Sequence, residues 1–450
     1  MIKNLLCVFM LMLSFNANAK TNYTNLTLEN GLQAYLIEDH RQPIAVHMMW
    51  YKAGSADEVA GKSGLAHLLE HLMFKGTDKI APQDFSKIIA KLGGIDNAST
   101  SFDYTNYFQM INTKNLSKAM SMEADRMENL KFSEEDFQTE RSVVIQERKQ
   151  RIDNSPWGRF YEKVMAALYE EMPYKTITTG TLEDLDNLTR KDSIDWYNTY
   201  YAPNNAILLV VGDLTPEKFK ELVEKNYSRL KPQEINHDKW NIEPKFEEPK
   251  KLVVNDKQVK SPTYYKIFRT PSFFKGIAGE EVNKNDIYNL IVLKELLGGS
   301  NTSYLYEKLV LNQELANSIS ADYTPIGRNE STFDFYLQVK DGVSISKMEK
   351  ALNFTIDEFT NNFNDQEKLD IAKTKITASQ IYARDDAMAF ARMMGKFLSA
   401  GGKIEDYDDL FIKLDEVSIE SIKSTAKKFL SSDQVLDAWL LPESKDVEKK

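Results

Sequence analysis

An internal repeat constrains the fold of this chain more than any other feature. Leu414-Asp415-Glu416-Val417-Ser418 follows the pattern of Leu185-Asp186-Asn187-Leu188-Thr189, at an offset of 229 residues in a chain of 450. The helix and strand expected after each segment match too, with Phe429 at the place of Tyr200 and Leu436 at that of Ile207. We therefore predict an α+β fold of two homologous domains, each a mainly antiparallel sheet packed with helices.

Composition divides the chain into four segments. Residues 1–19 combine one positive charge, an apolar run and the sequence Ala17-Asn18-Ala19, which predicts a secretory signal peptide. The only cysteine, Cys7, would leave with it, so no disulfide is expected in the mature chain. Residues 231–250 hold three prolines, many charges and no periodicity, and we interpret them as a linker. The expected domains are then 20–230 and 251–450.

Local patterns predict the elements of each half. Residues 23–39 alternate around Asn30-Gly31, which favours a hairpin with a type I′ turn. Strands are expected at 44–51, 97–100, 104–111 and 206–212, and helices at 116–130, 133–152, from 155, at 187–201 and at 216–230. In the second half we expect paired strands within 251–270, a strand at 331–340, a helix at 283–297 and one long helix from 365 to about 398.

Two of the five histidines occur in His67-Leu68-Leu69-Glu70-His71. Four residues apart on a helix, both imidazoles lie on one face and can converge on a single ion. The flanking sequence favours a helix, with Ser63 as its N-cap and Gly76 as its stop. His40, His47 and His237 are interpreted as hydrogen-bonded core residues.

Zinc suits the pair of imidazoles, but a peptidase zinc normally takes a third protein ligand and leaves the fourth position to water. Glu70, beside His71 and not expected to reach the same ion, is the natural general base for that water. The order of residues is the inverzincin signature.

A carboxylate on a later helix is one source of the third ligand. Glu140, Val143, Val144 and Glu147 lie on one stripe of the helix expected at 133–152, and carboxylates on an inward stripe need partners. Charged residues crowd this segment, however, so spacing alone favours an ordinary solvated position for Glu147. The sequence pattern leaves both alternatives open.

Overall charge and hydropathy exclude several classes of protein. The formal net charge is −10, which argues against nucleic acid or an anionic membrane as the main partner. No stretch after the signal peptide is apolar and long enough to predict a membrane span.

With these features in place, the chain resembles the insulinase/pitrilysin family of zinc metallopeptidases, in the short-subunit branch of mitochondrial processing peptidase and its bacterial relatives. The resemblance covers essentially the whole mature chain. It is carried by Asn30-Gly31-Leu32, Gly54-Ser55-Ala56-Asp57-Glu58, the stretch 64–77 around the histidine motif, Asp103-Tyr104-Thr105-Asn106-Tyr107, the stretch 140–147, and Tyr201-Ala202-Pro203-Asn204-Asn205.

The resemblance implies a role for each site residue. His67, His71 and Glu147 would bind one Zn²⁺ per chain, Glu70 would activate the water, and Glu140 would be a supporting catalytic carboxylate. Asn97, Ala98, Ser99 and Thr100 would form the edge strand to which a peptide substrate adds by backbone pairing. At the place that corresponds to the metal helix, the second half has Leu293-Lys294-Glu295-Leu296 and no histidine, so only the first half is expected to hold metal.

One departure from the family concerns the second half. Family members with a complete site usually carry an arginine and a tyrosine in a stretch that matches 309–317 here, where Val310 and Asn317 occupy those places. The expectation is therefore a zinc endopeptidase that forms half of a clamshell, with a homologous subunit supplying the arginine and tyrosine; a homodimer is less favoured. The alternative is a non-catalytic peptide-binding or structural subunit. The signal peptide and the bacterial character of the resemblance together favour the periplasm.

Overall fold

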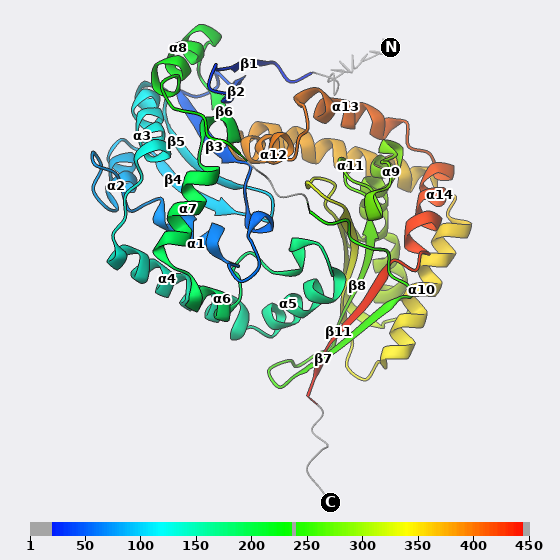
Figure 1. The fold of residues 1–450 in the computed structure, drawn as a ribbon. Helices are drawn as coiled ribbons and strands as arrows, with labels where there is room; N and C mark the ends of the chain where they lie inside the picture. The colour runs from blue at the N-terminus through cyan, green and yellow to red at the C-terminus, as the bar shows by residue number, and fades with distance from the viewer. Residues whose placement is uncertain (1–19, 236–239, 444–450) are drawn as a thin grey trace, which may run out of the picture.

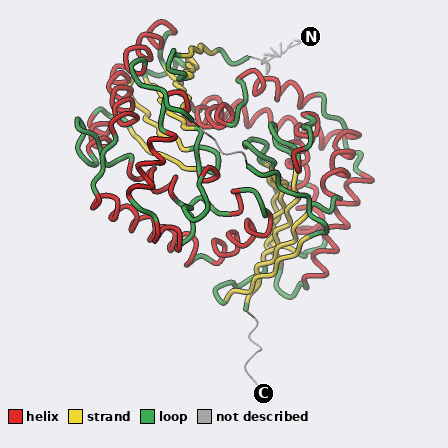
Figure 2. Tube along the Cα trace, viewed as in Figure 1, coloured by secondary structure: helices red, strands yellow, loops and turns green. Residues whose placement is uncertain are grey.

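The computed structural model describes residues 20–235 and 240–443, so the predicted signal peptide and His237 lie outside the described residues. Two sheets lie side by side, each with helices packed on it (Figure 1). Figure 2 shows the same arrangement by secondary structure, with helices around both groups of strands. The predicted α+β fold of two homologous domains is confirmed.

The first sheet has the strand order β1-β2-β6-β3-β5-β4. Its strands are β1 (Tyr23–Thr27), β2 (Gln33–Glu38), β3 (Ile44–Tyr51), β4 (Ile95–Thr100), β5 (Thr105–Asn112) and β6 (Ala206–Gly212). The helices of this half of the chain are α1 (Leu65–Leu72), α2 (Asp84–Lys91), α3 (Leu116–Asn129), α4 (Glu134–Arg148), α5 (Pro156–Leu168), α6 (Leu182–Asn187), α7 (Arg190–Tyr200) and α8 (Pro216–Tyr227).

The second sheet has the order β7-β11-β8-β10-β9. Its strands are β7 (Lys250–Asp256), β8 (Thr263–Thr270), β9 (Ala316–Tyr323), β10 (Ser331–Val339) and β11 (Val435–Pro442). The accompanying helices are α9 (Lys284–Gly298), α10 (Ile345–Asn362), α11 (Gln366–Asp385), α12 (Ala387–Ser399), α13 (Ile404–Asp415) and α14 (Ile419–Leu430).

Five strands of each sheet share one topology. The order β2-β6-β3-β5-β4 of the first sheet corresponds strand by strand to the order β7-β11-β8-β10-β9 of the second. Each sheet has one parallel pair, which is β2 with β6 in the first and β7 with β11 in the second, and its other pairs are antiparallel. Ile207 lies opposite Trp50 in the first sheet, and Leu436 lies opposite Ile267 in the second. The repeat that matches Ile207 with Leu436 in the sequence is therefore also a repeat in three dimensions.

One helix from each half of the chain packs against the sheet of the other half. α12 packs against β3 and β6 of the first sheet, and Gly395 lets it approach closely, because a Cβ there would lie 2.0 Å from the Trp50 indole. α5 packs in turn against β7 and β11 of the second sheet. Helices thus cover both faces of the first sheet at β3, which explains why every residue of β3 after Ile44 is buried.

Some local predictions are wrong. The β1–β2 hairpin forms, but Thr27 pairs with Gln33, so its loop is longer than a two-residue type I′ turn; the Asn30 side chain is buried and donates to the carbonyls of Tyr227 and Leu230. The strands within 251–270 both exist, yet β11 lies between them.

The long helix expected from 365 is also interrupted. It is divided at Asp386, whose carboxylate accepts from the backbone amides of Met388 and Ala389 and so starts α12 as a new helix. Among the residues that the structure describes, none of the helices combines the length and apolar character that crossing a bilayer requires.

Candidate metal centre

Helix α1 presents the two histidines of the motif one turn apart. The ring centroids of His67 and His71 are 5.0 Å apart and their planes are nearly perpendicular, at 89°. The start of the helix differs from the prediction, because Ser63 is not its N-cap: the Ser63 hydroxyl donates to Asp184, and Gly64 stands at the cap with φ of 86°. The helix ends at Leu72, before Gly76.

A carboxylate from outside the helix stabilises its first turn. Glu58 accepts from the backbone amides of Gly64 at 3.0 Å and Ala66 at 2.8 Å. Both amides belong to the orphan donors of a helix N-terminus, so Glu58 takes over the role predicted for Ser63.

Helix α4 brings Glu147 to both imidazoles. One carboxylate oxygen, Oε2, lies 3.4 Å from His67 Nε2 and 3.6 Å from His71 Nε2, and ligand atoms of the three residues all lie within 4.8 Å of one another. Neighbouring ligands of a tetrahedral zinc with bonds of about 2.0–2.1 Å stand roughly 3.3–3.5 Å apart. The spacing and the donor set of two imidazoles and one carboxylate therefore fit a zinc ion.

A second layer of side chains orients His71 and Glu147. His71 Nδ1 lies 3.0 Å from Glu140 Oε2, and the other oxygen of Glu140 pairs with the Lys75 ammonium at 2.6 Å. Arg151 holds the second oxygen of Glu147 at 2.5 Å. A histidine that donates through Nδ1 has its Nε2 lone pair free to bind metal, so Glu140 selects the tautomer that a metal needs.

Burial and nearby charge set the protonation of the imidazoles. Burial lowers the pKa of His67 to about 3, which keeps the ring neutral. Burial also disfavours the charged form of His71, but the hydrogen bond with Glu140 and the charges of the surrounding glutamates outweigh it and raise the pKa of His71. The site thus has one neutral donor and a surplus of negative charge that favours a cation.

Glu70 lies beside the triad and is held by the edge strand. The Thr100 hydroxyl donates to its carboxylate, while burial raises the pKa of Glu70 despite that bond. A carboxylate with a raised pKa is better suited to take a proton and pass it on. Thr100 is the last residue of β4, so the strand expected to bind substrate also positions the candidate base.

β4 is the edge of the first sheet and pairs only with β5 among the described strands. The amide of Ala98 donates to the side chain of Asn97 at 2.9 Å. Since β5 occupies only one side of β4, backbone groups on the other side are available for pairing with an added peptide.

Comparison with known proteins identifies the family. The insulinase (peptidase family M16) model matches residues 34–182, and the peptidase M16 inactive domain model matches 187–376. The zinc protease PqqE of Helicobacter pylori is 31% identical over 430 residues, which cover 93% of each chain. The chain belongs to peptidase family M16. The resemblance to insulinase/pitrilysin peptidases is therefore confirmed.

Other M16 relatives extend this picture. A probable mitochondrial-processing peptidase subunit beta of Arabidopsis thaliana is 24% identical, with 90% of this chain and 75% of that protein covered. The crystal structure of a protease from Helicobacter pylori has a TM-score of 0.87 at 30% identity and covers 94% of this chain and 100% of its own. The periplasmic protease PqqL of Escherichia coli shares the fold, with a TM-score of 0.79 at 17% identity, and this chain covers 47% of it.

The other two histidines that the structure describes, His40 and His47, have ordinary surroundings. His47 is buried and lies within hydrogen-bonding distance of Gln109 and Tyr227, as expected of a core residue. His40 is instead an exposed residue, paired with Asp213 and Glu38, so its assignment to the core is wrong.

The predicted inward stripe on α4 holds only in part. Val144 is buried, but Val143 is 44% exposed. Glu140 and Glu147 are nevertheless half-buried and reach His71 of α1, because α4 packs on that helix.

The second half of this M16 chain has a different arrangement at the equivalent place. In α9, Glu295 pairs with Lys375 of α11 at 3.5 Å, so an ammonium already neutralises the carboxylate. Val310 is half-buried in the π-helical turn Tyr306–Asn312, and Asn317 is an exposed residue near the start of β9. Neither side chain offers a guanidinium or a phenol.

Reasoning from the sequence missed three residues that hold the site, and one contact of a residue that it did name. Arg151 follows its partner Glu147 by four positions, and that spacing could have indicated the pair. Lys75 lies just after α1 and pairs with Glu140 of α4, so no local spacing indicates that contact. Glu58 reaches the helix from a loop, and the contact of Thr100 with Glu70 is tertiary, so no local pattern marks either contact.

Proposed function

We propose that this M16 chain is a zinc-dependent endopeptidase that hydrolyses peptides or unfolded protein segments in a closed chamber. The convergence of His67, His71 and Glu147 carries the proposal, because a set of two imidazoles and one carboxylate is a catalytic zinc set that leaves one position open. One zinc ion per chain follows from this single set among the described residues.

The residues around the set divide the chemistry between them. Zinc, when bound, supplies a Lewis acid that polarises the water and the scissile carbonyl. Glu70 takes a proton from the water on its carboxylate and passes it to the leaving nitrogen, while Thr100 fixes the orientation of that carboxylate. Glu140 acts on the ring of His71, whose orientation it sets. No covalent intermediate is required.

The substrate binds in this proposal along β4. Residues Asn97, Ala98, Ser99 and Thr100 offer the open edge, and a peptide that adds there as a strand is recognised by its extended backbone. The end of the strand at Thr100 brings such a peptide next to Glu70.

A homologous second subunit completes the chamber in this proposal. Val310 and Asn317 stand where an arginine and a tyrosine are expected, so this chain supplies neither group to an oxyanion. The chain corresponds to about half of the solved protease PqqL, which supports a working unit twice this size. We infer a heterodimer in the periplasm, reached by way of the signal peptide.

Reconstitution tests this proposal. The mature chain is assayed on an unstructured peptide alone and after co-expression with an M16 subunit that carries the arginine and tyrosine, with Glu70→Gln as control. Cleavage by the mixed complex only, lost in Glu70→Gln, is expected. Equal rates with and without the partner refute the heterodimer, and a chain that binds no zinc in either form supports the non-catalytic alternative.

A further inference from the structure

Two acidic residues of the family motifs have no part in the metal centre. Asp57 ends the 3₁₀ turn Ser55–Asp57 before α1, and Asp103 follows β4. Both are buried, with 9% and 8% of their surface exposed. Buried carboxylates require a compensating charge, and theirs comes from the other half of the chain.

That charge is Arg328, in the loop between β9 and β10. Its two terminal nitrogens donate to the two oxygens of Asp57 at 3.1 and 2.7 Å. Its backbone amide and Nε donate to Asp103 at 3.0 and 3.4 Å. The guanidinium also stacks on Trp240, with 4.4 Å to the ring centroid. Only an arginine can bind both carboxylates in this way.

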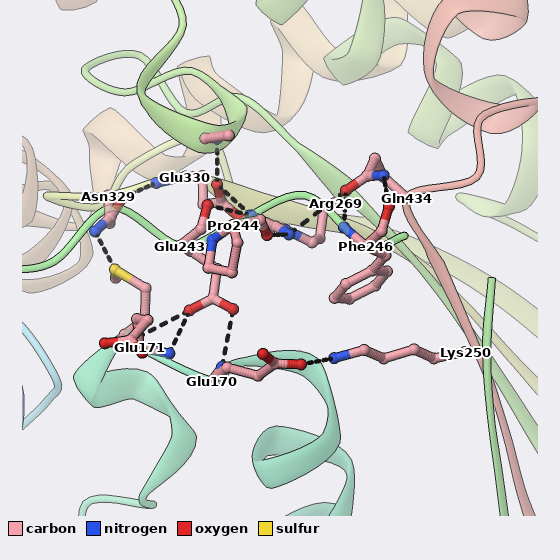
Figure 3. Close-up of polar contacts among 12 residues, drawn as sticks. Glu170, Glu171, Glu243, Pro244, Phe246, Lys250, Arg269, Asn329, Glu330 and Gln434 are labelled. Carbon is pink, nitrogen blue, oxygen red and sulfur yellow. Dashed lines mark hydrogen bonds and ion pairs between the residues drawn. The ribbon is translucent and has the colours of Figure 1, made fainter. Parts of the chain in front are cut away.

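The loop that carries Arg328 is itself firmly anchored. Two residues on, Glu330 forms a buried bidentate pair with Arg269, at 2.5 and 2.9 Å. Arg269 also donates to the carbonyls of Glu243 and Pro244, and the Glu243 carboxylate accepts three backbone amides at 170–172 (Figure 3). These contacts fix the loop, and with it the position of the Arg328 guanidinium.

The two segments that Arg328 holds are those that support Glu70. The amides of Ser55 and Ala56 donate to the carbonyls of Ser101 and Phe102, which ties the 3₁₀ turn to the end of β4. On one side, Glu58 follows Asp57 directly and caps α1. On the other, Thr100 lies three residues before Asp103 and donates to Glu70.

We propose that Arg328 is a positioning residue through which the second half of the chain fixes α1 and Glu70 relative to β4. This inference rests on the proposed function, in which Glu70 is the base. Arg328 contacts neither the metal set nor β4 directly; it acts through Asp57 and Asp103. The second half of the chain thus contributes to catalysis although it lacks a metal site of its own.

The test compares Arg328→Gln and Arg328→Lys with a matched control. Arg41→Gln removes another ion pair between the halves, Arg41 with Asp385 at 2.9 Å, on the exposed surface. All variants are made in the mature chain, assembled with its partner subunit if activity requires one. Zinc content, kcat and KM on an unstructured peptide, and hydrogen exchange of the Ser55, Ala56, Gly64 and Ala66 amides are measured.

A displaced base slows the chemical step more than it weakens binding. We expect Arg328→Gln to lower kcat by about 10- to 100-fold with KM within about twofold and zinc content unchanged, since small misplacements in a site have effects of this size. The four amides should exchange faster in Arg328→Gln than in wild type, whereas in Arg41→Gln they should exchange at the wild-type rate. Arg328→Lys keeps the positive charge but cannot bind both carboxylates, so its kcat and amide exchange should lie between those of Arg328→Gln and wild type. If Arg328→Gln does not fold, the test uses Arg328→Lys alone.

Two results overturn the inference. In the first, the Arg328 variants have the same kcat and the same amide hydrogen exchange as Arg41→Gln. In the second, their loss of activity is fully explained by loss of zinc or of folded protein. A wild-type complex that cleaves no peptide refutes the proposed function instead, and the exchange data then still report whether Arg328 orders α1 and the end of β4.

Discussion

Replacing Glu140 by glutamine tests the layer that orients the proposed metal ligands. The carboxylate serves His71 Nδ1 at 3.0 Å with one oxygen and the Lys75 ammonium at 2.6 Å with the other. The hydrogen bond with His71 is the main reason that the pKa of Glu140 lies below its ordinary value, so the group is charged. Glutamine can accept from His71 with its one carbonyl oxygen but cannot neutralise Lys75.

The expected effect is a loss of zinc affinity. Substitutions of residues that orient a metal-binding histidine typically weaken the metal by about 10- to 100-fold. That range corresponds to about 1.4–2.7 kcal/mol. The variant should therefore bind zinc with a Kd larger by one to two orders of magnitude, while its fold is kept, because α4 retains its capping box at Ser133 and Asp136.

Competition with a chromophoric chelator near neutral pH measures the zinc Kd directly. Glu135→Gln, on an exposed position of the same helix, is the matched control and should bind zinc as the wild type does. A Kd for Glu140→Gln within about twofold of that of the control would refute the role of Glu140 in fixing His71.

Three further perturbations have expected outcomes. Burial raises the pKa of Asp334 to about 7 from 3.8, so between these pH values the folded state holds a proton that the unfolded state has lost. The free energy of unfolding should therefore fall as pH rises from about 4 to about 7 and then level off. Thermal melts of Asp334→Asn should lack this pH dependence. Ala98→Pro removes an edge-strand amide that donates to the Asn97 side chain, so peptide KM should rise several-fold with little change in Tm, and an unchanged KM would contradict substrate pairing on β4. Chelation of zinc should lower Tm and added zinc should restore it, because the ion binds only the folded chain; a Tm insensitive to both would show that the set holds no metal.

Strands and helices with strong local patterns could be predicted from the sequence. β3 and β6 occupy 44–51 and 206–212 as expected, because long apolar runs suit strands covered on both faces. The helix start at residue 155 was also predicted, since the capping residue Ser155 acts within the helix itself.

Errors arose where a side chain has a distant partner. Ser63 would cap α1 by local rules, but it bonds instead with Asp184, 121 residues away. Asn30 is likewise held by Tyr227 and Leu230 rather than by a turn. Local propensity cannot reveal such competition, because the partners are brought together only by tertiary packing.

The candidate site divides in the same way. The spacing of His67 and His71 suffices to predict a shared ion, since both lie on one helix. Glu147 could not be told from a solvated position by spacing, and the packing of α4 on α1 is what turns its carboxylate inward. Arg328 and Asp57 are 271 residues apart, so no sequence pattern joins them.

The most direct test of the account is zinc content and peptide cleavage measured on one preparation each of wild type and Glu70→Gln, with the partner subunit present. We expect one zinc per chain in both proteins and cleavage only by the wild type, because Glu70 moves the proton without holding the ion. Cleavage that survives in Glu70→Gln, or a wild type that cleaves peptides without zinc, would contradict it.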